Sequence, residues 1–204
     1  MDTVHSTLAR ARRLIGMFCS PVELFGGLRP VGSDELPEPY RGLLDHRSHM
    51  TVAMERFCGG PVGLQVVAEQ RPDAAGRMSP EDRSRDRGWY AREILLADPQ
   101  GRLVQHGIVQ IDLDAVDATT AESIIEGVQP LGRILIAADL LRDVHDVGLL
   151  EVVPGPRLRS LLRIEDDGLT HATFGRVAQI SLNGKPAVNL LEIAAPGFLP
   201  KPLR

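Results

Sequence analysis

The stretch RVAQISLNGKPAVNLLEIA, which spans residues 176–194, decides the fold of this chain. Its first half alternates, and the side chains on its apolar face are Ala178, Ile180 and Leu182. Asn183-Gly184 is favoured in two-residue type I′ turns, because both turn positions need a positive φ. Residues 185–194 then return as a second strand, so the stretch predicts an antiparallel β-hairpin.

Other segments add strands and helices to this hairpin. Trp89–Ala97 and Leu103–Leu113 predict a second hairpin about the turn residues 98–101. Further strands are expected at 62–68 and 144–153, and helices at 3–17, 40–57, 119–128 and from Pro130 onward. Together they predict an α+β fold, in which an antiparallel sheet of five to six strands is accompanied by short helices.

The chain of 204 residues is predicted to form a single domain preceded by an arm. Residues 21–39 are rich in proline and glycine, so residues 1–39 are expected to be a helix followed by irregular chain, with the main domain at 40–204. Residues 71–88 are polar and highly charged, which predicts a mobile loop because such a segment buries little apolar surface.

Composition excludes several classes of partner. The net charge is −4 and the pI about 5.9, which argues against a nucleic-acid surface. No apolar run is long enough to span a bilayer, so no membrane partner is expected. Cys19 and Cys58 form no CxxC pattern, which favours free thiols in a reducing cytoplasm. A monomer or a homodimer is expected.

Arg92 is the first candidate site residue. Alternation places it on the same strand face as Tyr90 and Ile94. A guanidinium among apolar neighbours matches a ligand carboxylate in shape and charge. The alternative, an outward arginine paired with a surface carboxylate, is equally compatible with the sequence.

Glu192 and the turn Pro130-Leu131-Gly132 are the other candidates. Glu192 lies among apolar residues near the end of the last strand, where it would be an acid/base or hydrogen-bonding group. Leu131 and Gly132 would present backbone N–H groups to an anion at a helix start. Taken alone, these patterns are also those of a solvent-facing strand glutamate and an ordinary loop-to-helix junction.

The histidines predict no metal site. His46, His49 and His106 have no companion Asp, Glu or Cys at a familiar ligand spacing, and their roles stay open. The chain also lacks the GxSxG, P-loop, GxGxxG and HExxH motifs.

Several short segments together resemble the chorismate lyase-like family, which includes actinobacterial enzymes that form 4-hydroxybenzoate. The match runs from about residue 40 to 200. The segments follow the family's order of early helix, arginine strand, flap and closing hairpin: Leu44-Asp45, Met50-Thr51, Glu55-Arg56-Phe57, Arg92-Glu93-Ile94-Leu95-Leu96, Pro130-Leu131-Gly132-Arg133, and Asn183-Gly184-Lys185-Pro186 with Leu191-Glu192.

The resemblance implies an antiparallel sheet whose helical flaps enclose a ligand pocket. It implies a carbon–oxygen lyase that needs no cofactor and splits chorismate into 4-hydroxybenzoate and pyruvate. Arg92 would hold a carboxylate of the substrate, and Glu192 would bond the ring hydroxyl and assist proton movement. The backbone of Leu131 and Gly132 would meet the ring carboxylate, and Met50 would line the pocket.

Two alternatives stay open, because the family often has a second arginine where this chain reads Val104-Gln105-His106-Gly107-Ile108. One is a tailoring enzyme, such as a cyclase or dehydratase, that acts on another carboxylate or polyketide-like metabolite. The other is a non-catalytic small-molecule-binding module, since ligand-binding domains of some transcription regulators share this fold.

Overall fold

The computed structural model describes residues 2–71, 88–165 and 172–197. The strands are β1 (Gly26–Val31), β2 (Gly63–Gln70), β3 (Trp89–Ala97), β4 (Leu103–Asp112), β5 (Arg142–Pro154), β6 (Thr173–Leu182) and β7 (Lys185–Ala194). The α-helices are α1 (Asp2–Gly16), α2 (Tyr40–Leu44), α3 (Met50–Cys58), α4 (Ala118–Glu126), α5 (Leu131–Ala137) and α6 (Pro156–Leu162). Short 3-10 helices lie at Val22–Leu24, Ser33–Glu35 and Leu113–Ala115.

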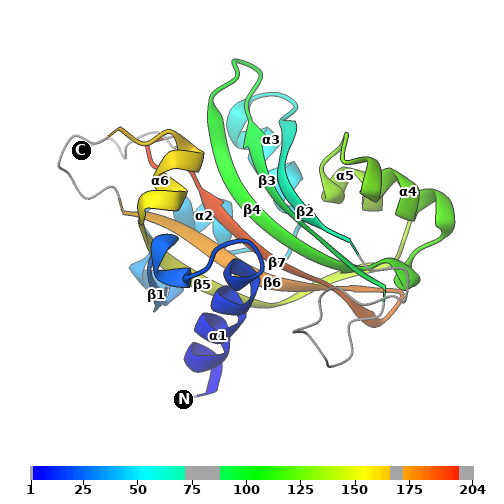
Figure 1. Cartoon of the computed structure of the whole chain (residues 1–204), viewed down its shortest axis with the longest axis horizontal. Helices are drawn as coiled ribbons and strands as arrows, with labels where there is room; N and C mark the ends of the chain where they lie inside the picture. Colours follow the sequence, from blue (N-terminus) through cyan, green and yellow to red (C-terminus); the bar gives the residue numbers. More distant parts are fainter. Residues whose placement is uncertain (1, 72–87, 166–171, 198–204) are drawn as a thin grey trace.

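The strands form one antiparallel sheet in the order β1-β5-β6-β7-β4-β3-β2 (Figure 1). This confirms the predicted α+β class, although the sheet has seven strands instead of five to six. Both predicted hairpins are present, as β3–β4 and β6–β7. The φ angles of Asn183 and Gly184 are 50° and 79°, as a type I′ turn requires.

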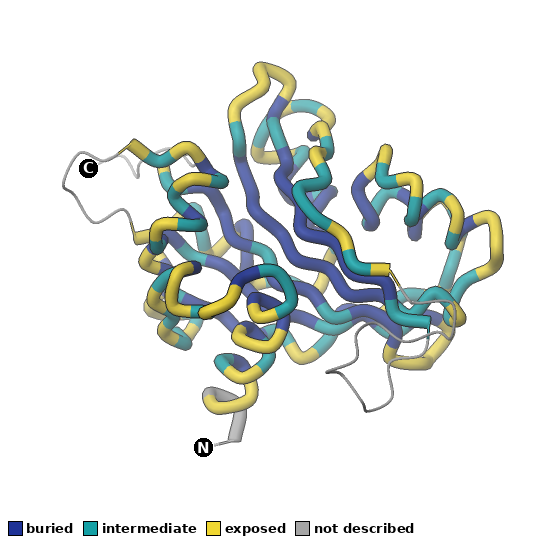
Figure 2. The backbone as a smooth tube through the Cα atoms, viewed as in Figure 1, coloured by how far each residue is buried: buried dark blue, intermediate teal, exposed yellow. Residues whose placement is uncertain are grey.

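Each face of the sheet is covered by different helices. On one face, Leu95, Ile108 and Leu191 pack with residues of α1 and α6 in one core cluster. On the other face, α2 and α3 cover one half of the sheet and α4 and α5 cover the other half. The central strands are accordingly buried along most of their length (Figure 2).

Two predictions about the first half of the chain were wrong. The proline- and glycine-rich stretch 21–39 contains strand β1, which pairs with β5, because Gly26 to Val31 find a partner edge that only the folded sheet provides. The single helix expected at 40–57 is broken into α2 and α3. Carbonyl groups of the intervening turn bond a buried arginine, so they are not available to a continuous helix.

Smaller differences concern two other helices. Helix α6 was not expected, and it begins at Pro156, where the fixed φ of proline suits a first helical turn. Helix α4 begins at Ala118, one residue before the predicted start, and it is capped by Asp117, whose carboxylate accepts a hydrogen bond from Thr120 N at 2.9 Å. Asp117 was overlooked although aspartate is among the best N-cap residues.

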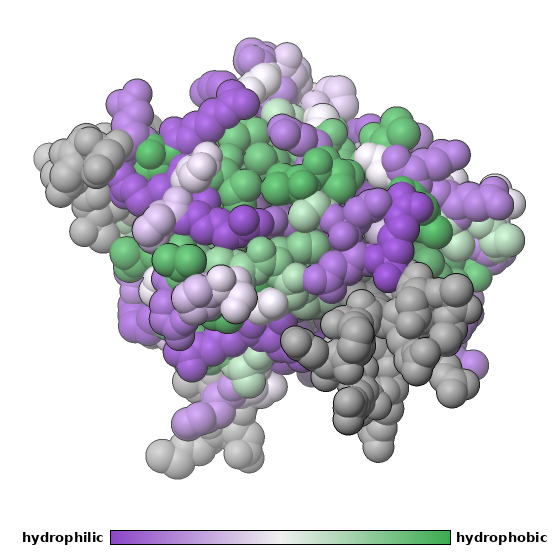
Figure 3. Space-filling view, viewed as in Figure 1, coloured by the Kyte–Doolittle hydropathy of each residue, from purple (hydrophilic) through white to green (hydrophobic). Residues whose placement is uncertain are grey.

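The surface that carries α1 and α6 is shown in Figure 3. It has an apolar area over the middle of the sheet, framed by hydrophilic side chains.

No described helix has the length and apolar character that crossing a membrane requires. Most of the predicted loop 71–88 falls outside the described residues, and the division of the chain at residue 39 remains a prediction.

Candidate functional site

A cavity lies on the sheet face that α2, α3, α4 and α5 cover. Its volume is about 40 Å³, and it is bordered by the start of α3, the start of α5 and strands β3 to β7. Its polar lining residues are Ser48, His49, Thr51, Gln105, Arg176 and Glu192. The remaining lining is aliphatic and includes Met50, Ile94, Leu96, Leu131, Ile180 and Leu190. A cavity of this volume has room for a few water-sized groups, so a larger ligand requires the helices to move apart.

The sheet register sets the floor of this cavity. Ile94 on β3 lies opposite Gly107 on β4, and Gly107 lies opposite Glu192 on β7. Glu192 in turn lies opposite Arg176 on β6. These four residues form one row across the sheet, and their side chains share a face because paired residues point the same way.

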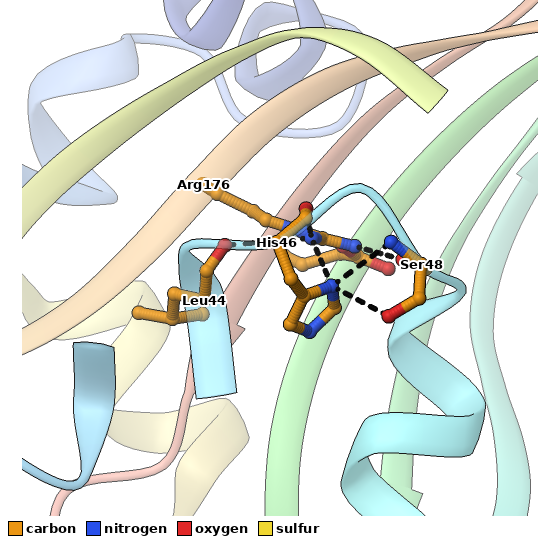
Figure 4. A network of polar contacts seen from close by, with 5 residues as sticks. Leu44, His46, Ser48 and Arg176 are labelled. Carbon is orange, nitrogen blue, oxygen red and sulfur yellow. Dashed lines mark hydrogen bonds and ion pairs between the residues drawn. The ribbon is translucent and has the colours of Figure 1, made fainter. Parts of the chain in front are cut away.

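Arg176 is the centre of a buried polar network (Figure 4). Its side chain is 1% exposed, and its Nε donates to Glu192 Oε2 at 2.7 Å. Its Nη atoms donate to the carbonyl groups of Leu44, His46 and Ser48 at 2.8–3.4 Å. The guanidinium thus binds the carboxylate on one side and the turn between α2 and α3 on the other, which fixes the wall that leads into α3.

His46 contributes an acceptor to the same network. Its Nδ1 lies 3.2 Å from Arg176 Nη1 and also 3.2 Å from the backbone N of Ser48, which donates to it. Arginine and a backbone N–H only donate, so Nδ1 is the unprotonated acceptor and the ring proton sits on Nε2. Burial and the positive charge of Arg176 both lower the pKa of His46.

The starts of α3 and α5 both border the cavity. Neither α3 nor α5 has a side-chain cap, since His49 and Pro130 occupy their N-cap positions. The first N–H groups of each helix have no partner within the helix. A Cβ added to Gly132 would lie 2.8 Å from Thr51 Oγ1, so the two starts approach closely because residue 132 is glycine. An ion pair between Arg133 and Glu55 joins the two helices.

Arg92 lies on the same face of the sheet but outside the lining of the cavity. Its side chain is buried, and its Nη atoms donate to the carbonyl groups of Ile124 and Gln129, each at 3.2 Å. Burial lowers the pKa of Arg92, and Tyr90 and Glu69 oppose this effect. Because Gln129 precedes Pro130, Arg92 supports the α4–α5 segment that forms one wall of the cavity.

The structure therefore brings together four of the five candidate residues: Met50, Leu131, Gly132 and Glu192 all line the cavity. Arg92 does not. Arg176 was not among the predicted site residues, although it lines the cavity and pairs with Glu192. Its signal was present, because alternation places Arg176 on the apolar face of Ala178, Ile180 and Leu182.

His106 belongs to a second buried polar cluster on the opposite face of the sheet. Its Nε2 lies 3.0 Å from Glu93 Oε1, and Arg157 of α6 forms an ion pair with the same carboxylate. His106 and Glu93 are fully buried beside Phe25. Within residues 2–71, 88–165 and 172–197, no group of three or more His, Cys, Asp or Glu side chains is arranged to hold a metal ion.

Comparisons with known proteins identify the fold. No family model and no curated protein matches the chain. Among solved structures, the effector domain of PhnF from Mycobacterium smegmatis aligns over 72% of this chain and 88% of its own, at 12% identity and a TM-score of 0.51. This chain shares the fold of that domain.

Two further structures align less closely. Whole PhnF from Mycobacterium smegmatis covers 95% of each chain at 13% identity, with a TM-score of 0.48. The ligand-binding domain of a putative GntR-family transcriptional regulator from Bordetella bronchiseptica covers 65% of this chain and 84% of its own, at 12% identity and a TM-score of 0.44. At such low identities a likeness concerns the fold and leaves the activity open.

Proposed function

We propose that this chain is a small-molecule-binding module whose cavity takes an organic carboxylate. The observation that carries the proposal is the cavity between the starts of α3 and α5, in which Arg176, Glu192 and four other polar residues face an aliphatic wall. Cavities of this kind, apolar with a few converging polar groups, are typical of ligand sites. The likeness to an effector domain supports the same proposal at the level of the fold.

The position of the carboxylate follows from the charges around the cavity. Uncapped N–H groups at the start of α3 carry partial positive charge, and Arg176 lies behind the same turn. Glu192 already neutralises Arg176, so the ligand's negative charge is placed at the helix start, away from Glu192. Arg92 acts through the wall that it supports, by holding the carbonyl group of Gln129.

A pair of matched ligands tests the proposal. Titration calorimetry with 4-hydroxybenzoate and with 4-hydroxybenzamide compares a carboxylate with a neutral group of similar shape. We expect the acid to bind about tenfold more tightly, since hydrogen bonds to a charged group are the stronger ones. Equal affinity for both ligands would contradict the proposed carboxylate site.

The second candidate function is the chorismate lyase reaction. Its support is that Met50, Leu131, Gly132 and Glu192, which the resemblance assigns to the substrate, line one cavity. Incubation of the purified protein with chorismate tests this function directly. Equimolar 4-hydroxybenzoate and pyruvate would establish the lyase, whereas binding of 4-hydroxybenzoate without turnover of chorismate would establish the binding module.

A further inference from the structure

Gln105 is the one cavity-lining residue whose side-chain oxygen is both buried and without a partner among the described residues. The residue is 3% exposed, and its Oε1 has no hydrogen-bond partner. Leaving a buried acceptor unpaired costs free energy, so such groups are rare in folded proteins. This acceptor borders the cavity, which makes a ligand or a trapped water its natural partner.

The sheet register places Gln105 near the ion pair between Arg176 and Glu192. Gln105 lies opposite Ala194 on β7, two residues along from the pair formed by Gly107 and Glu192. Diagonal neighbours of this kind are about 7–8 Å apart across a sheet. The intervening Gly107 has no side chain, and the space above it is bordered by Ile94 and by Gln105 itself: a Cβ at residue 107 would lie 3.1 Å from Ile94 Cγ1 and 3.7 Å from Gln105 Nε2.

We infer that Gln105 determines the specificity of the cavity by accepting a hydrogen bond from a hydroxyl group of the ligand. The inference rests on the proposed function and narrows its ligand class to hydroxylated carboxylates. The amide is neutral, so it pairs with a hydroxyl without adding charge beside Arg176 and Glu192. A ligand that lacks the hydroxyl leaves the acceptor unpaired and binds less tightly.

The matched residue for a test is Gln110 on the same strand. It is also buried, at 1% exposed, but it faces the other side of the sheet. Its Oε1 accepts hydrogen bonds from Arg13 at 2.5 Å and from Asn189 at 3.4 Å. Gln110 thus has the same chemistry and burial as Gln105, with its acceptor satisfied by the protein.

The experiment measures binding of 4-hydroxybenzoate and benzoate to the wild type, Gln105→Met and Gln110→Met, together with the Tm of each ligand-free protein. We expect the wild type to prefer 4-hydroxybenzoate about tenfold and Gln105→Met to lose this preference. Methionine fills the same space without an unpaired acceptor, so Gln105→Met should raise the Tm by roughly 2 °C or more. Gln110→Met should lower the Tm and keep the preference.

Two results would overturn the inference. One is an undiminished preference for 4-hydroxybenzoate in Gln105→Met. The other is a fall in Tm for Gln105→Met that equals the fall for Gln110→Met, because the amide would then be bonded within the protein. Failure of both probes to bind the wild type contradicts the proposed function itself, whereas equal binding of both contradicts the specificity of Gln105 alone.

Discussion

Arg92 and Arg176 are both buried to 1% exposed on the same face of the sheet, yet their surroundings differ. Arg176 pairs with a carboxylate and borders the cavity. Arg92 bonds two carbonyl groups beneath α4 and α5, and its Nε has no partner among the described residues. A buried arginine is therefore not by itself a sign of ligand contact. The role of each arginine depends on which helices or turns cover the sheet at its position.

The largest expected effect is that of Arg176→Met. It leaves Glu192 without its partner and frees the carbonyl groups of the turn between α2 and α3. Breaking a buried pair from one side costs about 3–5 kcal/mol, and we expect a loss of unfolding free energy near the lower end, because Glu192 is 12% exposed. Urea denaturation measures it, and a loss below about 1 kcal/mol would show that the pair is not structural.

Arg92→Met should lower the free energy of unfolding by less than Arg176→Met does, by about 1–2 kcal/mol. Methionine keeps the packing of the aliphatic stem, and removing the charge also removes the desolvation that lowers the pKa of Arg92. Affinity for 4-hydroxybenzoate should fall several-fold, because the wall at Gln129 loses its support. The same denaturation and calorimetry experiments apply. A complete loss of carboxylate binding with an unchanged fold would instead support the direct clamp that the resemblance implies.

Gly132→Ala tests the close approach of α3 and α5 with a smaller effect. The added Cβ meets Thr51 Oγ1 at 2.8 Å, whereas a Cβ at the control residue Gly42 meets nothing nearer than 3.8 Å. Crowding of this kind typically costs about 1–3 kcal/mol, from which the helix preference for alanine subtracts up to about 1 kcal/mol. We expect Gly132→Ala to be less stable than Gly42→Ala and to bind 4-hydroxybenzoate more weakly. Equal stability of the two variants would show that the starts of α3 and α5 move apart at little cost in free energy.

The smallest expected effect is on the dependence of stability on pH. Burial lowers the pKa of His46 and of His49, and Arg176 adds to both effects. The groups facing His46 are Arg176 from β6 and Asp45 from its own turn. The unfolded chain takes up protons at about pH 6.5, before the folded protein does, so the stability present at neutral pH is lost as the pH falls below that value.

Unfolding free energies measured from pH 7.5 to 5.5 check this prediction. His46→Asn retains an acceptor near the position of Nδ1 but does not titrate, so its stability should fall less steeply than that of the wild type over this range. An identical slope in the variant and the wild type would exclude His46 from the effect. Arg176→Met should also flatten the slope, since the positive charge that opposes protonation of His46 is removed.

Much of the fold was predictable, because it depends on local patterns. The alternation and turn residues of both hairpins predicted strands β3, β4, β6 and β7, and the apolar stripe at 3–17 predicted α1. Strand β1 was not predictable, since Gly26 to Val31 have no strand pattern of their own and are ordered by pairing with β5. The break between α2 and α3 was overlooked for the same reason: it depends on Arg176, which is about 130 residues away.

The candidate site divides in the same way. Sequence by itself determined that an arginine and a glutamate stand on the last hairpin, and that a glycine lies in the first turn of the α5 segment. It did not determine that Arg176 and Glu192 pair. Leu182 lies opposite Lys185, so an unbroken register six residues further along each strand would set Arg176 opposite Leu191.

A β-bulge near Ile180 and Ser181, where Pro186 has no N–H to donate to the ladder, shifts the register by one residue and sets Arg176 opposite Glu192. Such a shift moves every later side chain of one strand to the other face. The packing of both faces selects it, because it buries Leu190 against α4 and α5 and Leu191 against α1 and α6. The sequence thus determined which residues lie on these strands, and only the tertiary structure decided that Arg176 and Glu192 meet.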